Sequence, residues 1–392
     1  MSPTSPTVLI VAGTRPEAIK VAPVVHQLRS PGSPLGAHLL ATGQHPDLAA
    51  EALADLDLVA DTTLALHPSD RSSQAALLAA LLPALSAQIE ARRPAAVLVQ
   101  GDTASAFAGG LAALWAQVPL VHLEAGLRSG DLAHPFPEEA YRRQLGAIAS
   151  LHLAPTPRAV ANLRAEAVAA DAIALTGNTV VDAARMVAAN QPGPGLAPTP
   201  GRRRVLLTTH RRESWGQPLH DVLDAAAELV ATVPDVELLV PVHPNPNVGR
   251  EVRNRLGGVE RVVLTEPLSY RDLVAVLATA TLVLTDSGGI QEEAPSFGVP
   301  VLVLREVTER PEAVEAGCAR LVGTDRARVL AEARTLLTDP VAWQAMARVA
   351  NPFGDGRAAE RSVGAMAALL LGHPAPEPWA SRPLVRAAGG PG

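Results

Sequence analysis

Residues 8–20 read VLIVAGTRPEAIK, and this stretch decides the fold. Its apolar, β-branched start predicts a buried strand over 8–12. Gly13 permits a tight turn, and Pro16 suits the first turn of a helix that runs through Lys20. The N-terminus of that helix would face the carboxyl end of the strand, so an anion is expected there, near Arg15 and Lys20. An ordinary turn is the alternative, because the GxGxxG pattern of dinucleotide-binding turns is missing.

The same alternation of short strands and Ala/Leu-rich helices continues along the chain. Most of the expected strands are continuous apolar runs, which are typical of parallel strands covered on both faces. Residues 191–201, QPGPGLAPTPG, predict a loop near a boundary between two sheets. The sequence therefore predicts an α/β protein with two doubly wound parallel sheets. The expected strands are 8–12, 96–100, 120–123, 205–208, 237–240, 262–265, 282–285 and 301–304.

The composition excludes several classes of protein. The 392 residues suggest two or three domains at about 150 residues each. A net charge of −6 gives no basic field for nucleic acid or an anionic membrane. One cysteine, Cys318, excludes an intrachain disulfide framework and fits a reducing compartment. The longest apolar run, 75–89, falls short of the ~18 residues that a membrane span needs, and no secretory signal is found, so a cytoplasmic protein is expected.

The basic residues are almost all arginine. The 33 lysines and arginines comprise one lysine, Lys20, and 32 arginines. Because an ammonium is a compact charge and a guanidinium a planar fork, this lysine could mark a site that needs the smaller group; a chance position on a solvated helix is the alternative. Residues 202–204, all arginine, are interpreted as a solvated charge run.

A second turn with phosphate-binding features follows the strand at 282–285. Residues 286–294 read DSGGIQEEA, so Ser287, Gly288 and Gly289 would open a helix whose amides and hydroxyl close on phosphate oxygens. Glu293, one to two turns later, could accept hydrogen bonds from ribose hydroxyls. The alternative is that Glu292 and Glu293 only favour the helix dipole.

Carboxylates follow two strands of the first predicted sheet. Asp102 comes after the strand at 96–100, and Glu124 follows the strand at 120–123. Ligands of open α/β sheets bind beyond the carboxyl ends of strands, and several carboxylates together have divergent pKa values that suit acid/base work. Glu138 is a third candidate, whereas Glu139 is interpreted as a solvated helix residue. Asp102 could instead be a helix N-cap.

Two histidines lie at expected strand ends in the second half of the chain. His210 stands beside Arg211 in THRRE, and His243 lies in VHPNPN, so both are candidates for phosphate contact or acid/base chemistry. A structural role is the alternative for either one. The remaining histidines show no metal-ligand spacing, so no metal site is expected.

In their order, eleven motifs resemble the non-hydrolysing UDP-N-acetylglucosamine 2-epimerases. They are GTRPEAIKVAPVV, TGQH at 42–45, QGDT, HLEAGLRSGD, PFPEEAYR, TGNTVVDA at 176–183, HRRES, PVHPNPNV, TDSGGIQEEAPS, TERPEAVEAG and NPFGDG at 351–356. The resemblance implies a GT-B-like fold, with two Rossmann-like domains facing a cleft. It places a catalytic domain at 1–178, a UDP-binding domain at 179–355 and a helix returning to the first domain at 356–372. Residues 373–392 are expected to be disordered.

The resemblance also implies an activity and its residues. UDP-GlcNAc would be converted reversibly to UDP-ManNAc, by elimination of UDP and its re-addition to a 2-acetamidoglucal intermediate, without cofactor or metal. Asp102, Glu124 and Glu138 would be the acid/base groups, and His210 would assist at the diphosphate. A homodimer is implied. The implied substrate-binding residues are Arg15, Lys20, His243, Leu273, Ser287, Gly288, Gly289, Glu293 and Arg310.

Two departures from the family pattern affect these implications. Leu273 stands where an aromatic residue is usual near the uracil, and Pro46 and Asp47 replace polar or basic residues after TGQH. The latter change bears on an allosteric UDP-GlcNAc site that the resemblance implies at Gln44, Arg71, Arg211 and His243. A GT-B glycosyltransferase, an epimerase for a related UDP-2-acetamido sugar and a non-catalytic sensor are the rival hypotheses.

Overall fold

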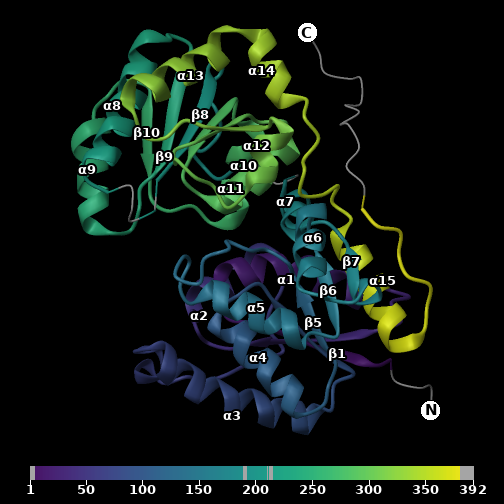
Figure 1. The fold of residues 1–392 in the computed structure, drawn as a ribbon. Coiled ribbons are helices and arrows are strands. Elements are labelled where there is room, and N and C mark those ends of the chain that lie inside the picture. The colour runs from purple at the N-terminus through teal and green to yellow at the C-terminus, as the bar shows by residue number, and fades with distance from the viewer. Residues whose placement is uncertain (1–4, 189–191, 210, 212–214, 380–392) are drawn as a thin grey trace. The chain divides into compact units, whose positions relative to one another are not determined.

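The chain forms two compact α/β units. The computed structural model describes residues 5–188, 192–209, 211 and 215–379. The first unit contains the described residues through Ala183 and returns at Gly354, and the second contains those from Ala184 to Phe353. In each unit, helices lie on both faces of a parallel sheet (Figure 1). The predicted doubly wound α/β architecture is therefore confirmed.

The first unit has a seven-stranded sheet in the order β3-β2-β1-β4-β5-β6-β7. Ile10 of β1 lies opposite Leu39 of β2 and Leu98 of β4, and all three are fully buried. The order reverses direction between β1 and β4, which is where doubly wound sheets bind ligands. The strands are β1 (Thr7–Ala12), β2 (Gly36–Ala41), β3 (Thr62–Thr63), β4 (Ala96–Gln100), β5 (Leu120–Leu123), β6 (Leu151–Ala154) and β7 (Ile173–Leu175). The helices are α1 (Arg15–Arg29), α2 (Pro46–Asp55), α3 (Gln74–Arg92), α4 (Ala104–Trp115), α5 (Glu138–Ile148), α6 (Pro157–Ala165), α7 (Thr179–Val187), which continues into the second unit, and α15 (Ala358–Leu371), with 3-10 turns η1 (Pro68–Arg71) and η2 (Ala170–Ala172).

The second unit has a six-stranded sheet in the order β10-β9-β8-β11-β12-β13, with its reversal between β8 and β11. Its core lies between the sheet and helices such as α8, α9 and α13. The strands are β8 (Arg203–Thr208), β9 (Val236–Pro241), β10 (Val262–Thr265), β11 (Leu282–Thr285), β12 (Val301–Val303) and β13 (Ala319–Leu321). The helices are α8 (Gln217–Thr232), α9 (Pro246–Leu256), α10 (Tyr270–Thr279), α11 (Gly288–Glu293), α12 (Pro311–Ala316), α13 (Arg326–Thr338) and α14 (Pro340–Ala347), with the 3-10 turn η4 (Ala294–Phe297).

The last helix belongs to the first unit. Asp182 of α7 accepts hydrogen bonds from the N–H groups of Ala358 and Ala359, at 3.2 and 2.8 Å, and so satisfies two free donors at the start of α15. The chain then runs on to Trp379, which is 4% exposed and whose N–H donates to the Leu175 carbonyl at 2.9 Å. The expectation of disorder from residue 373 is therefore wrong at Trp379, which is buried and bonded to β7.

Arg204 also differs from expectation. It is only 2% exposed, and its Nε donates to Glu237 on the neighbouring strand at 2.8 Å. The same guanidinium donates to the carbonyls of Leu196 and Ala197, and Glu237 accepts from the Thr199 N–H at 3.1 Å. The second of the three arginines, Arg203, is partly exposed and pairs with Asp235. The interpretation of 202–204 as a solvated run is thus wrong at Arg204, which holds the loop before β8.

By length and composition, one helix among the described residues could cross a membrane, namely α3. Its residues Leu77, Leu81, Leu85 and Ile89 are buried in the core of the first unit. They recur every four residues, so one stripe of the helix packs inward. Over residues 74–89, the other faces carry uncharged side chains, mostly small or apolar, that are exposed or half-buried.

Candidate active site

Glu124 is the most constrained carboxylate of the first unit. It directly follows β5 and has a φ of +62°, a left-handed conformation that a non-glycine residue adopts only when its surroundings hold it there. The ammonium of Lys20 lies 2.6 Å from each of its two carboxylate oxygens. Asn178 donates to Oε1 at 3.0 Å, and Gln100 donates to Oε2. A buried carboxylate with these donors is held in one orientation.

Asp102 is held by a different cation. Nε of Arg142, on α5, lies 2.6 Å from Oδ2 of Asp102. Burial raises the pKa of Asp102 above its usual value, opposed by Arg142 and reinforced by the negative charge of Glu124. Thr103, not Asp102, is the N-cap of α4, because its hydroxyl accepts from the Ala106 N–H at 3.0 Å. Asp102 is therefore a carboxyl group near an anionic one, with a pKa displaced toward neutrality.

The two glutamates that begin α5 have different surroundings. Glu138 is half-buried. Burial of the Tyr141 phenol raises its pKa, and the charge of Glu138 raises it further. Glu139 is completely buried, contrary to its interpretation as a solvated residue. It accepts from the Ser129 N–H at 3.0 Å, from Arg143 at 3.1 Å and from Arg142 at 3.2 Å. Burial would raise its pKa, but these donors outweigh burial and hold the pKa of Glu139 below its usual value.

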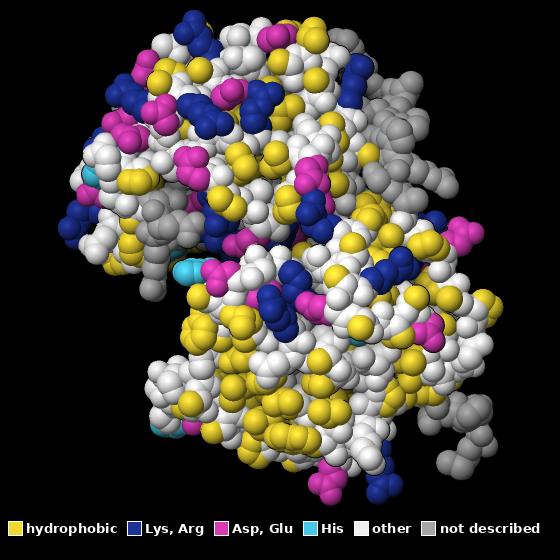
Figure 2. Space-filling model, viewed as in Figure 1, with side chains coloured by type: hydrophobic (Ala, Val, Ile, Leu, Met, Phe, Trp, Pro, Cys, Tyr) yellow, Lys and Arg dark blue, Asp and Glu magenta, His cyan; other side chains and the backbone are white. Residues whose placement is uncertain are grey.

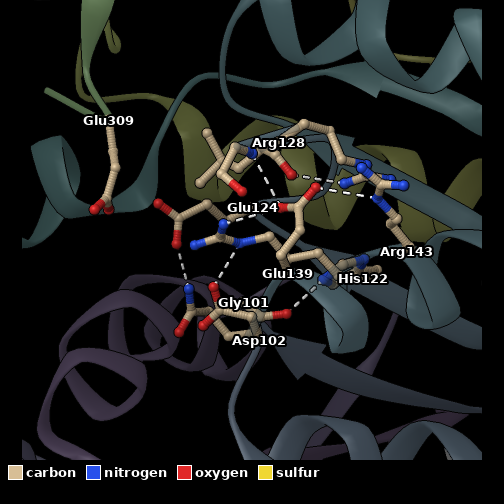
Figure 3. A network of polar contacts seen from close by, with 12 residues as sticks. Gly101, Asp102, His122, Glu124, Arg128, Glu139, Arg143 and Glu309 are labelled. Atoms are coloured by element: carbon tan, nitrogen blue, oxygen red, sulfur yellow. Dashed lines mark hydrogen bonds and ion pairs between the residues drawn. The ribbon is translucent and has the colours of Figure 1, made fainter. Parts of the chain in front are cut away.

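Arg142 consequently links two carboxylates from separate elements. Its guanidinium contacts Asp102 after β4 and Glu139 on α5, and Figure 3 shows the network around these side chains. The side chain of Arg142 is 12% exposed, so solvent screens these contacts little. The polar network of this unit therefore has two centres, one at Glu124 with Lys20 and one at Asp102 with Arg142.

The turn after β1 is tight and already carries a carboxylate. A Cβ on Gly13 would lie 2.0 Å from the Ser105 hydroxyl and 2.3 Å from that of Thr42, so only glycine fits. Glu17 accepts from the Gly13 N–H at 3.0 Å and from the Thr103 hydroxyl at 2.7 Å. Burial raises the pKa of Glu17 to about 7. The sequence predicted that an external anion would bind at this turn. In the structure, the Gly13 amide already donates to the carboxyl group of Glu17.

The other candidates of this unit are dispersed. Arg15, the first residue of α1, is half-buried. Gln44 uses its amide oxygen to accept from the Ser105 N–H at 3.2 Å and from its hydroxyl at 2.7 Å. Arg71 lies exposed on η1. Gln44 therefore has a partner inside the unit, whereas Arg71 remains at the surface.

In the second unit, the turn between β11 and α11 is built as the sequence predicts. Ser287 precedes α11, and Gly288 and Gly289 begin it. The Ser287 N–H donates to the Thr285 hydroxyl at 2.9 Å, and that hydroxyl lies 2.6 Å from the hydroxyl of Thr208 on β8. The amide of Gln291 donates to the Ser287 carbonyl at 3.0 Å. The turn is thus fixed from both sides of the point where the sheet order reverses.

Acidic and basic candidates surround this turn. Arg310 Nε donates to Glu292, and a Cβ on Gly288 would lie 3.9 Å from the Arg310 guanidinium. Glu293 is 5% exposed, and Leu273 is half-buried on α10. Arg310 therefore lies beside the Gly288-Gly289 turn, close enough for both to contact one ligand.

The histidine and arginine candidates near β8 and β9 are partly described. His210 lies outside the described residues. The Arg211 N–H donates to Asp286 at 3.0 Å, and its guanidinium lies 3.3 Å from Glu309. His243 accepts from the Asn245 N–H through Nδ1 at 3.0 Å and lies edge-on to Trp215. Within residues 5–188, 192–209, 211 and 215–379, no group of three or more His, Cys, Asp or Glu side chains could hold a metal ion.

Comparison with known proteins decides the family. A family model described as UDP-N-acetylglucosamine 2-epimerase matches residues 32–367. The chain belongs to the UDP-N-acetylglucosamine 2-epimerase family. The Escherichia coli K12 UDP-N-acetylglucosamine 2-epimerase is 42% identical over 374 residues, which are 92% of this chain and 98% of that relative.

Solved epimerase structures have the same fold. A crystal structure from Listeria monocytogenes aligns with a TM-score of 0.90 at 39% identity and covers 96% of this chain and 99% of its own. The Neisseria meningitidis UDP-GlcNAc 2-epimerase, crystallised with UDP-GlcNAc, aligns with a TM-score of 0.82 at 36% identity, over 90% of this chain and 97% of its own. The predicted GT-B-like epimerase fold is therefore confirmed.

Several polar residues of this epimerase-family chain were not among the sequence-based candidates. Arg142 follows Glu138 by four positions and Glu139 by three, a spacing that places it on the same side of the helix as both glutamates, one turn further on. That spacing was a usable signal for Arg142. Gln100 is the last residue of β4, and Asn178 lies 54 positions after Glu124. Only the pairing of β4 with β5 and the path of the chain after β7 reveal that both residues contact Glu124.

Proposed function

We propose that this protein interconverts UDP-GlcNAc and UDP-ManNAc by epimerisation at C2 of the sugar. A base removes the C2 proton, the C1–O bond breaks, and UDP leaves with that electron pair, which gives 2-acetamidoglucal. In the return step, the C2 carbon receives a proton on its other face, and a UDP oxygen bonds to C1. The atoms balance without an oxidant or a reductant, so the reaction requires acid/base groups and a site that retains UDP.

The observation that carries the proposal is the pair of carboxylates at the ends of β4 and β5. Burial gives Asp102 a raised pKa, whereas Glu124 has a cation and two amides as partners. Their different surroundings support different roles at one reaction centre. We assign Asp102, Glu124 and Glu138 to acid/base chemistry at C2, with His210 at the diphosphate.

We assign the second unit to the nucleotide. The Ser287 hydroxyl and the amides of the Gly288-Gly289 turn, at the start of α11, suit phosphate oxygens, and Arg310 adds a positive charge beside that turn. Glu293 is assigned to the ribose hydroxyls, and Leu273 and His243 to further contacts with the nucleotide sugar. Arg15 and Lys20 are the cations that the first unit offers to the substrate.

The test is incubation of the protein with UDP-GlcNAc in D₂O, followed by NMR. We expect UDP-ManNAc with deuterium at C2 and no acceptor requirement. Asp102→Asn should abolish the exchange, whereas Asp171→Asn, at an exposed position of η2, should leave it unchanged. Free ManNAc with stoichiometric UDP, or turnover only with an added acceptor, would refute the proposal in favour of a hydrolase or a glycosyltransferase.

We also propose that the protein works as a homodimer in a reducing compartment, the cytoplasm. Residues 74–89 of α3 contain no charged side chain, and Trp115 of the neighbouring helix α4 is 63% exposed. Figure 2 shows hydrophobic side chains gathered on the first unit, in the region where Figure 1 places α3 and α4. Such a patch supports association with a second copy. Light scattering should give twice the mass of 40.6 kDa, and Ala79→Glu on the exposed face of α3 should shift it to the monomer.

A further inference from the structure

We propose that His122 is a positioning residue for Asp102, acting through a hydrogen bond from its imidazole to the carbonyl of Gly101. The inference rests on the proposed function, in which Asp102 exchanges a proton with the substrate. Figure 3 shows the His122 ring and the Gly101 carbonyl joined by this hydrogen bond, with Asp102 as the next residue of the turn.

The sheet places His122 beside this turn. Its strand β5 pairs with β4 so that His122 lies opposite Val99 and Leu123 lies opposite Gln100. Gly101 follows β4, and its N–H donates to the Leu123 carbonyl at 3.0 Å. The His122 Nε2 lies 2.8 Å from the Gly101 oxygen. The Gly101 N–H is thus fixed by the backbone of Leu123, and the Gly101 carbonyl is fixed by the side chain of His122.

The conformation of Gly101 makes the contact between His122 and the Gly101 carbonyl important. Gly101 has a φ of +68°, and a Cβ built on it would meet nothing within 4 Å. Glycine is therefore needed for the backbone conformation rather than for space, and its freedom must be restricted by outside contacts. The peptide that joins Gly101 to Asp102 carries the carbonyl bound by His122. If that peptide rotated, the Asp102 side chain would turn away from Arg142.

The chemistry of His122 suits a permanent donor. Burial lowers the pKa of His122 to about 4, with smaller effects of the same sign from His152 and Arg128; the Gly101 carbonyl and Glu124 oppose it. The ring is therefore neutral at physiological pH and has one N–H. Because a carbonyl oxygen only accepts, that hydrogen is on Nε2, and Nδ1 is a buried acceptor that has no hydrogen-bond partner among the described residues.

Packing alone does not account for this histidine. An apolar side chain would fill the buried position without leaving a ring nitrogen unpaired, so the N–H toward Gly101 is what the imidazole adds. Asp102 is then held at two ends, with Arg142 at the carboxylate and His122 at the preceding peptide. A catalytic carboxyl group gains most from this, because a displacement of about 1 Å can cost roughly 100-fold in rate.

A matched control lies on the next strand. His152 of β6 is directly opposite His122, is equally buried at 1% exposure, and also has an Nδ1 without a hydrogen-bond partner in the part of the chain described. Burial lowers its pKa to about 4 as well, and its ring bonds to the Ala149 backbone rather than to Gly101. Replacing either histidine removes a similar buried ring, but only His122 touches the turn before Asp102.

The kinetic test compares His122→Leu, His122→Gln and His152→Leu with the wild type in the UDP-GlcNAc assay. We expect His122→Leu to lower kcat about 10- to 100-fold, with KM changed less than about threefold. His122→Gln should recover most of kcat, because its amide nitrogen is as many bonds from Cβ as Nε2 of histidine. Equal losses in His122→Leu and His152→Leu, or no recovery with glutamine, would refute the positioning role while the wild-type activity upholds the proposed function.

A second readout needs no substrate. Carbon-13 labelling of the aspartate carboxyls follows the titration of Asp102, whose resonance is the one lost in Asp102→Asn. His122→Leu should raise the pKa of Asp102 further, because the carboxylate loses its alignment with Arg142, whereas His152→Leu should not change it. An unchanged Asp102 titration in folded His122→Leu would overturn the inference even if the enzyme proved to act on another substrate.

Discussion

The ammonium of Lys20 lies 2.6 Å from both carboxylate oxygens of Glu124, across 104 residues of sequence. The side chains of Lys20 and Glu124 are only 11% and 5% exposed, so water cannot replace either group as the partner of the other. The single lysine of an arginine-rich chain therefore has a defined task. It pairs with a carboxylate that is also held by backbone conformation.

We predict that Lys20→Met destabilises the protein by about 3 kcal/mol or more, because it leaves the Glu124 charge buried without its cation. The double variant Lys20→Met/Glu124→Gln should recover most of that stability, since both charges are then absent. Turnover should stay lost in both variants. Urea unfolding with a double-mutant cycle measures the coupling, and additive single effects would contradict the ion pair.

Lys20→Arg tests the size of the cationic group. The charge is retained, but Lys20 is 8% exposed and its ammonium fits between two oxygens, so a larger planar group must displace its neighbours. We expect a loss of kcat of at least tenfold with a smaller loss of stability than in Lys20→Met. Wild-type turnover and UDP-GlcNAc affinity in Lys20→Arg would show that the compact ammonium is not required.

Glu17 predicts a pH dependence of stability. Its pKa is 4.5 in an unfolded chain and about 7 in the buried site, so between these values the folded protein keeps a proton that the unfolded chain releases. The free energy of unfolding therefore falls as pH rises from about 4.5 to about 7, by roughly 3 kcal/mol from this group. In Glu17→Gln, the amide can still accept from Gly13 and contact Thr103, but this proton is absent.

The measurement is urea unfolding of wild type and Glu17→Gln between pH 4.5 and pH 8. We expect the stability of the wild type relative to the variant to decline through this window. Glu90→Gln, at an exposed position near the end of α3, is the control and should run parallel to the wild type. Parallel curves for Glu17→Gln would mean that Glu17 is ionised in the folded protein throughout.

The sequence predicted eight of the thirteen strands of the described residues. Strands β4, β5, β10 and β11 have the predicted bounds, because each is rich in valine and leucine and lies between turn residues. Strands β2, β3, β6, β7 and β13 were not predicted. They are short or interrupted, as in LHLA for β6 and ARL for β13, and pairing with neighbouring strands stabilises them more than any local pattern indicates.

The site residues also divide into those that the sequence could indicate and those that only the folded structure reveals. Asp102 and Glu124 were predicted because parallel strands end at one edge of a sheet, which is a rule of topology. Glu139 was misjudged, since charge alone suggested solvent, whereas three donors from Ser129, Arg142 and Arg143 make its complete burial tolerable. Long-range partners such as Asn178 depend on the folded path, so no local pattern could indicate them.

Arg142 and Arg143 form a natural pair for testing the Asp102 centre. Both contact Glu139, but only Arg142 reaches Asp102, and Arg143 is 42% exposed. We predict that Arg142→Met lowers kcat about 100-fold and raises the pKa of Asp102, because an opposing positive charge is removed from a half-buried carboxyl group. Arg143→Met should keep kcat within about threefold. Similar kinetic losses in both variants would indicate that the arginines act through Glu139 and the fold of α5 instead.

The buried pair Arg204–Glu237 predicts an effect on stability that leaves the chemistry intact. Arg204 holds Glu237 and two carbonyls of the loop before β8, so Arg204→Met leaves a buried carboxylate and unpaired carbonyl groups, and should cost about 3–5 kcal/mol. The neighbouring pair Arg203–Asp235 has side chains 34% and 50% exposed, so Arg203→Met should cost about 1 kcal/mol or less. Urea unfolding gives both values, and kcat measured at low temperature on the folded fraction should match the wild type. Equal destabilisation by the two variants would mean that neither the burial of the Arg204–Glu237 pair nor its contacts with the loop carbonyls add to stability.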